Sequence, residues 1–161
     1  MVNSKELKAL QIRRASKFDI RGLVTLENEC FDTYYRQHRF SKAHFAYYLQ
    51  NPHAILLVAV LNTSIIGYVA GSLKIARFES SAHLDSIAAS QLYRRRGVGN
   101  QLIRCFFEEA KQQACTSVIL EVAAANKSGD LFFTNAGFEK IRILKGYYDE
   151  SIDGILMRLD L

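Results

Sequence analysis

Residues 87–102 read IAASQLYRRRGVGNQL, and most of what the chain reveals about its architecture follows from this stretch. It joins the end of a strand to a basic turn with two glycines and then to the start of a helix. Gly97 and Gly99 let the backbone approach a ligand closely, and the first helical turn presents unpaired N–H groups where the helix dipole favours negative charge. The stretch therefore predicts an anion-binding cradle formed by Arg94, Arg95, Arg96, Gly97, Val98 and Gly99.

The glycine pattern distinguishes this cradle from two other phosphate-binding sites. The G-x-x-x-x-G-K-[ST] pattern of a P-loop is absent, and the G-x-G-x-x-G pattern of dinucleotide-binding proteins is incomplete. Three consecutive arginines can also form an ordinary solvated turn. Because Gly-x-Gly follows them directly at a predicted helix start, we favour an anion site, with a pyrophosphate as its ligand.

Strand and helix patterns alternate along the rest of the chain. β-Branched and apolar runs predict strands at residues 9–14, 54–61, 65–75, 83–89, 117–122, 138–144 and 154–159. Apolar residues at three- and four-residue intervals predict helices at 16–31, 97–113 and 127–136. A further helix begins after the capping residue Ser41 and ends before Pro52. Polar residues 145–153, KGYYDESID, predict a loop. Helices interleaved with a central β-meander indicate a mixed-sheet α/β or α+β layer.

The composition bounds the class of protein. The chain has 161 residues, 49% of them hydrophobic and 23% charged, so we expect residues 1–161 to form a single domain. A chain of this size buries about 70% of the surface that it exposes when unfolded. Three cysteines without C-x-x-C spacing indicate neither disulfides nor a metal site and fit a reducing, cytoplasmic setting. Neither a signal peptide nor an apolar run of about 20 residues is present, so we expect no membrane segment.

The charge balance permits an anionic partner. Lys and Arg number 21 against 16 Asp and Glu, which gives a net charge of +5. The basic residues are spread along the chain instead of lying on one predicted helix face with interleaved aromatic residues. We therefore expect no nucleic-acid binding.

Several segments together resemble the GNAT N-acetyltransferases. The spacing Arg94-x-x-Gly97-x-Gly99 matches the family signature [QR]-x-x-G-x-[GA], and LEVAAAN at 120–126 and FFTNAGF at 132–138 are similar to later family segments. KGYY at 145–148 and DGILM at 153–157 resemble the tail of the branch that acetylates the N-terminal alanine of ribosomal proteins. The resemblance extends over about residues 11–159. It implies a GNAT-like fold of the α/β (α+β) class, with a mixed, mostly antiparallel central sheet of about six to seven strands flanked by about four helices.

The resemblance also implies the co-substrate and its contacts. Acetyl-CoA would supply the acetyl group, and an amine would attack its thioester directly, without a covalent enzyme intermediate and without a metal. Backbone groups of Ile87, Ala88 and Ala89 would contact the pantetheine and the acetyl carbonyl. The cradle would hold the pyrophosphate, mainly through N–H groups. The side chain of Asn126 would contact the cofactor beyond the following strand.

The reaction needs a base, because an alkyl ammonium is almost fully protonated at neutral pH. Glu121 is our candidate, since it interrupts an apolar strand and aligns with the proposed base of the ribosomal-protein branch. Burial raises the pKa of such a carboxyl, and it could act through one water molecule. The alternative is a strand-end glutamate that pairs with a neighbouring Lys or Arg.

One position departs from the family pattern. Many members place a tyrosine where this chain has Phe133, to protonate the departing CoA thiolate, and phenylalanine has no proton to donate. Three interpretations compete: the thiolate leaves unprotonated, another tyrosine such as Tyr93, Tyr147 or Tyr148 donates, or the protein is a CoA-binding regulator with little turnover. We favour the first two because the cradle is intact.

The acceptor is expected to be a primary amine, either a protein or peptide N-terminus or a small-molecule amine. In the family the first two helices border the acceptor, so one or two of a small group should face it: Tyr34, Tyr35, Arg36 and Arg39. Tyr147 and Tyr148 lie in the predicted polar loop, where the peptide acceptors of the family lie, and are candidates for acceptor contact. His83 and Asp85 could assist proton transfer, but a strand-edge histidine near a loop more often has a structural role, so we leave both out of the catalytic assignment. We expect a monomer or a homodimer.

Overall fold

A seven-stranded sheet forms the centre of the fold. The computed structural model describes residues 9–31 and 35–161. Its strands are neighbours in the order β1-β2-β3-β4-β5-β7-β6. All neighbouring pairs are antiparallel except β4 and β5, which are parallel. The strands are β1 Leu10–Arg14, β2 Ala54–Leu61, β3 Ser64–Lys74, β4 Ser80–Ala89, β5 Cys115–Ala123, β6 Glu139–Asp149 and β7 Ile152–Asp160.

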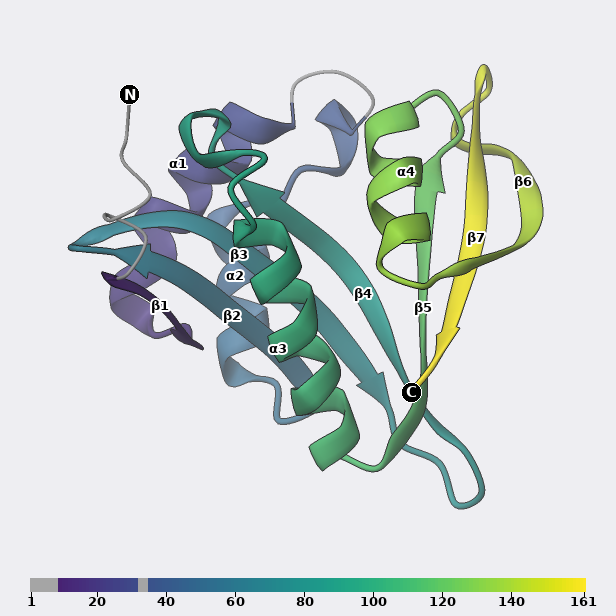
Figure 1. Cartoon of the computed structure of the whole chain (residues 1–161), viewed down its shortest axis with the longest axis horizontal. Helices are drawn as coiled ribbons and strands as arrows, with labels where there is room; N and C mark the ends of the chain where they lie inside the picture. The colour runs from purple at the N-terminus through teal and green to yellow at the C-terminus, as the bar shows by residue number, and fades with distance from the viewer. Residues whose placement is uncertain (1–8, 32–34) are drawn as a thin grey trace.

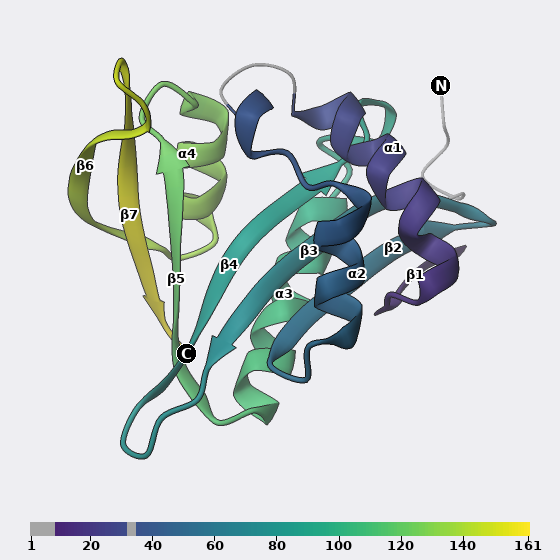
Figure 2. The ribbon, with the colours of Figure 1, turned by 180° about the vertical axis from the view of Figure 1, so that it is seen from behind.

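Helices cover both faces of this sheet (Figures 1 and 2). In the described residues they are α1 Ile20–Cys30, α2 Lys42–Gln50, α3 Val98–Gln112 and α4 Lys127–Asn135. α1 and α2 lie on one face, whereas α3 and α4 lie on the other. The expected mixed, mostly antiparallel sheet flanked by helices is confirmed. None of these helices is long and apolar enough to cross a bilayer, a statement that covers the described part of the chain.

Each face of the sheet has its own core. α3 presents apolar residues at three- and four-residue intervals, and its Leu102 and Phe106 are fully buried against the sheet. On the opposite face Leu23 of α1 and Phe45 of α2 pack around Tyr68 of β3. β2, which reads AILLVAVL, lies between the two cores. Burial on both sides explains why its apolar run is unbroken.

The C-terminal hairpin differs from the expectation. Strand β6 continues to Asp149, and only residues 150–151 separate it from β7, so the predicted loop over 145–153 is wrong. Pairing with β7 is interrupted between Leu144 and Asp149, where Gly146 has a φ of 57°. β6 is the edge strand, and nearly all of its residues are exposed. The polar composition of this segment reflects an edge strand in contact with solvent, and not a loop.

β4 and β5 separate within the sheet. Their parallel pairing covers Ser80–His83 of β4 and ends where His83 faces Ile119. Beyond that point the two strands diverge (Figure 1). The edge of residues 84–89 that faces β5 is therefore open.

A bulge in β4 lies next to this point. Ser86 pairs with Ala70 of β3, but Leu84 pairs with Gly71, so Asp85 is an extra residue without a partner across the ladder. The side chains of Asp85 and Ser86 consequently both reach groups on the α1–α2 side of the sheet. In a regular strand two successive side chains would point to opposite faces.

Candidate active site

The predicted anion cradle lies at the N-terminus of α3. Gly97 is the N-cap residue with a φ of 84°, and a Cβ atom there would meet nothing within 4 Å, so backbone conformation and not space requires glycine. The first helical hydrogen bond runs from the Gln101 N–H to the Gly97 carbonyl. The N–H groups of Val98, Gly99 and Asn100 therefore precede the helical ladder and point out of the helix start.

Close packing explains the second glycine. A Cβ at Gly99 would lie 3.2 Å from the ring of Phe132 on α4, which is tighter than ordinary contact. Arg94 is exposed and its Nε donates to the Ala89 carbonyl at 3.2 Å, while Arg95 is exposed in a left-handed conformation with a φ of 56°. Cationic side chains and free N–H groups thus meet at one helix start. This combination fits a phosphate or pyrophosphate group.

The open edge of β4 offers further backbone groups. The Ser90 N–H donates to the Ile66 carbonyl of β3 at 2.9 Å. Because the polar groups of an antiparallel strand alternate between its two edges, those of Ala88 turn toward β3 and those of Ile87 and Ala89 turn toward the open edge. Ile87 therefore presents its backbone groups there, whereas Ala89 presents its N–H, because the Ala89 carbonyl already accepts from Arg94 Nε and Cys30 Sγ.

Three ionisable side chains meet where β4 and β5 separate. The His83 ring lies between two carboxylates, with Nε2 at 2.7 Å from Glu121 Oε2 and Nδ1 bonded to Asp85 Oδ1. Burial by itself would lower the pKa of His83, but hydrogen bonds to Asp85 and Glu121, together with the charges of both, raise it to about 10. The ring is therefore a cation at neutral pH and donates to both carboxylates.

Three tyrosines surround this cluster. The Tyr48 hydroxyl, on α2, donates to Asp85 Oδ2 at 2.6 Å, and the Tyr148 hydroxyl donates to the backbone carbonyl of Glu121 at 2.9 Å. Burial, followed by the charge of Glu121 and a hydrogen bond to it, raises the pKa of Tyr147. β6 therefore brings two tyrosines to the predicted base, although the sequence had assigned them to a loop.

These groups line a pocket of about 550 Å³. Its walls come from the segment before α2 and from α2, β4, β5 and β6. The segment before α2 contributes His38, Arg39 and Phe40, and α2 contributes His44 as well as Tyr48. The cradle residues lie outside this pocket. β4 joins the two regions, because residues 85–89 extend over about 13 Å from the pocket to the cradle end of the strand.

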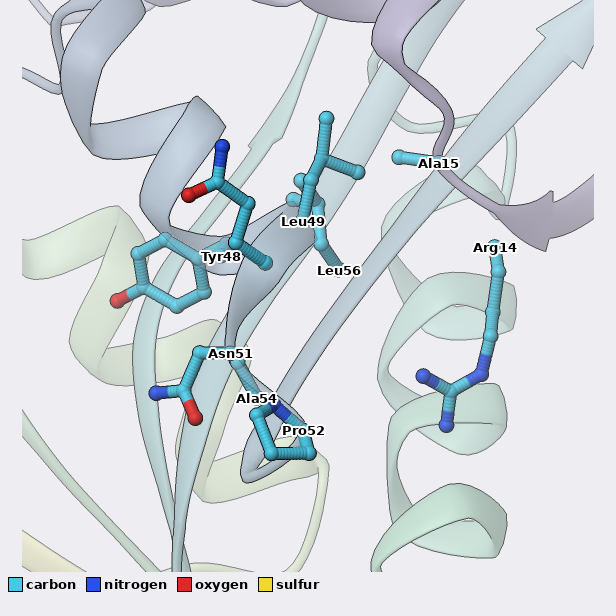
Figure 3. A pocket seen from close by; sticks show the side chains of 9 residues that line it. Arg14, Ala15, Tyr48, Leu49, Asn51, Pro52, Ala54 and Leu56 are labelled. Atoms are coloured by element: carbon cyan, nitrogen blue, oxygen red, sulfur yellow. The ribbon is translucent and has the colours of Figure 1, made fainter.

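A second pocket of about 300 Å³ lies at the C-terminal end of α2 (Figure 3). Tyr48 and Asn51 lie on one side of it and Arg14 on the other. Arg14 is paired with Glu109 of α3. Tyr48 lines both pockets, but the second pocket contains no other residue of the cluster around His83.

Asn126 is engaged in local structure. Its side-chain oxygen caps α4 by accepting the Gly129 N–H at 3.0 Å, and its amide donates to the Tyr35 hydroxyl at 3.1 Å. That hydroxyl also accepts the Ala123 N–H at 3.1 Å. Of the residues expected near the acceptor, Arg39 lines the large pocket and Tyr34 lies outside the described residues.

His83 and Asp85 are the residues that the sequence interpretation left out of the site. The signal was present, because His83-x-Asp85 places two polar side chains on one face of a strand otherwise rich in small and apolar residues. The sequence alone did not show that these side chains lie beside Glu121, because it did not show that β5 is the strand next to β4. The partner of Glu121 is consequently a histidine, and not the Lys or Arg of the alternative interpretation.

Comparisons with known proteins agree with this fold. Residues 20–138 match the model of the acetyltransferase (GNAT) family. The chain is 23% identical to an N-alpha-acetyltransferase of Sulfurisphaera tokodaii, over 98% of this chain and 97% of that protein. Its fold is similar to the ribosomal-protein-S18-alanine N-acetyltransferase from Escherichia coli, with a TM-score of 0.79, 21% identity and coverage of 94% and 93% of the two chains. It is also similar to Arabidopsis thaliana NAA60 in complex with acetyl-CoA, with a TM-score of 0.82, 17% identity and coverage of 94% and 98%.

Proposed function

The chain belongs to the GNAT acetyltransferase family, and on that premise we propose that it transfers the acetyl group of acetyl-CoA to the α-amino group of a peptide or protein N-terminus. The observation that carries the proposal is the carboxylate of Glu121, held by His83 in a pocket at one end of the open β4 edge, with the anion cradle at the other. The name of the Sulfurisphaera tokodaii relative supports an α-amino acceptor.

The residues present fit the co-substrate. The N–H groups of Val98 and Gly99 and the arginines at 94–96 suit a pyrophosphate, and the open edge at Ile87 and Ala89 suits the amide-bearing pantetheine arm. A fold neighbour from Arabidopsis thaliana was solved with acetyl-CoA, which supports acetyl-CoA as the co-substrate. Ala88 would then contribute by spacing the two edge residues, and Asn126 by shaping the start of α4.

Glu121 would serve as the base. It accepts one proton from the incoming ammonium, directly or through a water molecule, so that the amine becomes a nucleophile. The nitrogen then bonds to the thioester carbonyl carbon while the carbon–sulfur bond breaks and its electron pair leaves on sulfur. The nitrogen loses a second proton to become an amide, and the thiolate takes up one proton. One proton is released per turnover, which balances the reaction.

The walls of the pocket suit a peptide acceptor. Tyr147 and Tyr148 come from β6, and Arg39 and Phe40 come from the segment before α2, so an extended chain could lie between the two sides. Aromatic walls with a few polar groups are typical of pockets that orient a flexible ligand.

The test is release of CoA thiol from acetyl-CoA in the presence of peptides that differ at the N-terminal residue, with spermidine and free lysine as small amines. Acetylation of at least one peptide α-amino group, confirmed by mass spectrometry, is the expected result. Turnover of the small amines alone would identify a small-molecule acetyltransferase. Binding of acetyl-CoA without release across the whole panel would identify a regulator and refute the proposal.

Glu121→Gln tests the assigned base. We expect kcat to fall by about 10²-fold or more and the acidic limb of the rate profile to flatten, because the amide cannot accept a proton. Acetyl-CoA affinity should stay unchanged, since the cradle is remote from the substitution. Glu108→Gln, an exposed residue of α3, is the matched control and should behave as the wild type. An unchanged pH profile in Glu121→Gln would remove Glu121 as the base.

A further inference from the structure

We propose that Asp85 is a positioning residue of this active site: it holds the His83 ring against Glu121, and Tyr48 holds Asp85 in turn. The inference rests on the proposed acetyl transfer and deepens it. It concerns a chain of four side chains that leads from helix α2, through β4, to the base on β5.

The hydrogen bonds form one continuous path. The Tyr48 hydroxyl donates to Asp85 Oδ2 at 2.6 Å, and the other oxygen of Asp85 accepts from His83 Nδ1. His83 Nε2 lies 2.7 Å from Glu121 Oε2. Each oxygen of Asp85 and each nitrogen of His83 therefore has one partner in the path. Such a path fixes the ring plane, because rotation of the imidazole would break both of its hydrogen bonds.

The bulge in β4 makes this path possible. Asp85 is the residue without a partner in the ladder with β3, so its carboxylate can turn toward both His83 and Tyr48. Bulges commonly re-aim one side chain beside a site. The path thus depends on the bulge at Asp85, which regular pairing of β3 with β4 would not produce.

The path matters because β4 no longer supports β5 at the level of Glu121. Backbone pairing between the two strands ends at His83 opposite Ile119, and the His83 side chain spans the gap that opens beyond this point. The His83 ring lies between the carboxylates of Asp85 and Glu121 and donates a hydrogen bond to each of them. It thereby offsets the repulsion between the two negative charges and fixes the position of Glu121.

The other charged and titratable groups around the ring are engaged elsewhere. His38 Nε2 lies 3.1 Å from the Tyr148 carbonyl, and His44 Nδ1 accepts the Ser41 N–H at 2.9 Å. The charge of Arg39 acts on the buried Glu27 of α1. Tyr147 and Tyr148 of β6 face Glu121 from the opposite side of the pocket. The direct partners of the His83 ring are therefore Asp85 and Glu121.

The first measurement follows the His83 imidazole by NMR in the full chain without substrate, and His83→Gln identifies its signals. In the wild type we expect titration of the ring at a pKa of about 10, because hydrogen bonds to Asp85 and Glu121 stabilise the cation. We expect Asp85→Asn to lower that pKa, because one of the two carboxylates that stabilise the cation is gone. An unchanged His83 titration in Asp85→Asn would overturn the inference. This result needs no turnover, whereas a wild type that acetylates nothing would refute the proposed function instead.

The second measurement is the pH profile of kcat/KM with the best acceptor peptide. We expect Asp85→Asn to lower the rate near neutral pH by about tenfold or more. The alkaline limb, where the His83 ring loses its proton, should move to lower pH, because one of the two carboxylates that stabilise the cation is gone. The KM for acetyl-CoA should not change. A lower rate without a shift of this limb would assign Asp85 a merely structural role and overturn the inference.

Two further variants complete the test. Asp160→Asn removes an exposed carboxylate of β7 that pairs with Arg158, so it should keep the wild-type rate and profile. Tyr48→Phe keeps the ring that stacks on Phe40 but removes one hydrogen bond to Asp85, and we expect a loss of about fivefold. A larger loss in Tyr48→Phe than in Asp85→Asn would contradict the order of the path. If Asp85→Asn fails to fold, Tyr48→Phe undergoes the same two measurements.

Discussion

Phe133 occupies the position where the family resemblance leads one to expect a tyrosine. Its side chain, on α4, is buried in the core, with its ring centroid 5.2 Å from that of Phe132 and 5.8 Å from that of Phe138. Tyrosine hydroxyls nonetheless lie near the base, because Tyr147 and Tyr148 reach Glu121 from β6. This arrangement is consistent with the interpretation in which another tyrosine supplies the proton that Phe133 cannot donate.

Phe133→Tyr tests this interpretation at the scale of one residue. We expect the free energy of unfolding to fall by about 1–3 kcal/mol, because the new hydroxyl enters an apolar core without a partner. The rate should not show the gain of about 10² that a missing general acid would restore. Urea unfolding and CoA-release rates measure the two effects. A large gain in rate would show that the absent tyrosine limits the enzyme.

At the scale of an element, the junction of β1 with α1 depends on one carboxylate. Asp19 precedes α1 and accepts two hydrogen bonds from Arg13 of β1, at 2.8 and 2.9 Å. It also accepts the Ser16 N–H at 2.7 Å. The hydrogen bonds from Arg13 and then those from Ser16, which outweigh the effect of burial, lower the pKa of Asp19 from 3.8 to about 2. The ion pair thus orients α1 on the sheet.

This pKa predicts how stability depends on pH. A carboxyl whose pKa is lower in the folded state stabilises the protein above its unfolded pKa, and the contribution is lost as the pH falls from about 4 toward 2. Asp19→Asn should therefore cost about 2 kcal/mol at pH 7 and clearly less at pH 3. Urea unfolding at the two pH values measures the difference, with Asp160→Asn as the exposed control. An equal cost at both pH values would contradict the role of this ion pair.

At the scale of the whole molecule, the separation of β4 from β5 divides the sheet into two parts. β1–β4 carry α1, α2 and most of the α3 contacts, whereas β5–β7 carry α4. The strands remain joined at Ser80–His83, and the His83 side chain bridges them further along. A co-substrate placed along β4, with its pyrophosphate at the start of α3 beside α4, would contact elements of both parts.

Such binding should stabilise the entire fold. Acetyl-CoA at about 100 times its Kd should add about 2.7 kcal/mol to the free energy of unfolding, by mass action. For a chain of this size the gain corresponds to an increase in Tm of about 5–10 °C. Pantetheine, which lacks the pyrophosphate, should raise the Tm much less at the same concentration. Equal shifts from the two compounds in thermal unfolding would refute the cradle as the phosphate site.

Local patterns in the chain were sufficient to predict most of the helices and strands and the backbone form of the cradle. Helix α3 begins where Gly97 adopts its left-handed conformation, and Gly99 permits close packing, so short-range backbone chemistry specifies this turn. The helices were recognised because each buries one apolar face, which leaves a three- to four-residue period in the sequence. The continuation of β6 through Asp149 was missed because an exposed edge strand and a polar loop have similar compositions.

The arrangement around Glu121 required long-range information. Three features bring His83, Asp85 and Tyr48 together: the parallel pairing of β4 with β5, its end at His83, and the one-residue bulge at Asp85. Each of these features depends on which strands become neighbours and on the register in which they pair. Packing between segments far apart in the chain decides the neighbours and the register. The sequence therefore specified the residue types proposed to bind anions and accept protons. Folding specified their partners, because hydrogen bonds across strands have no local signature.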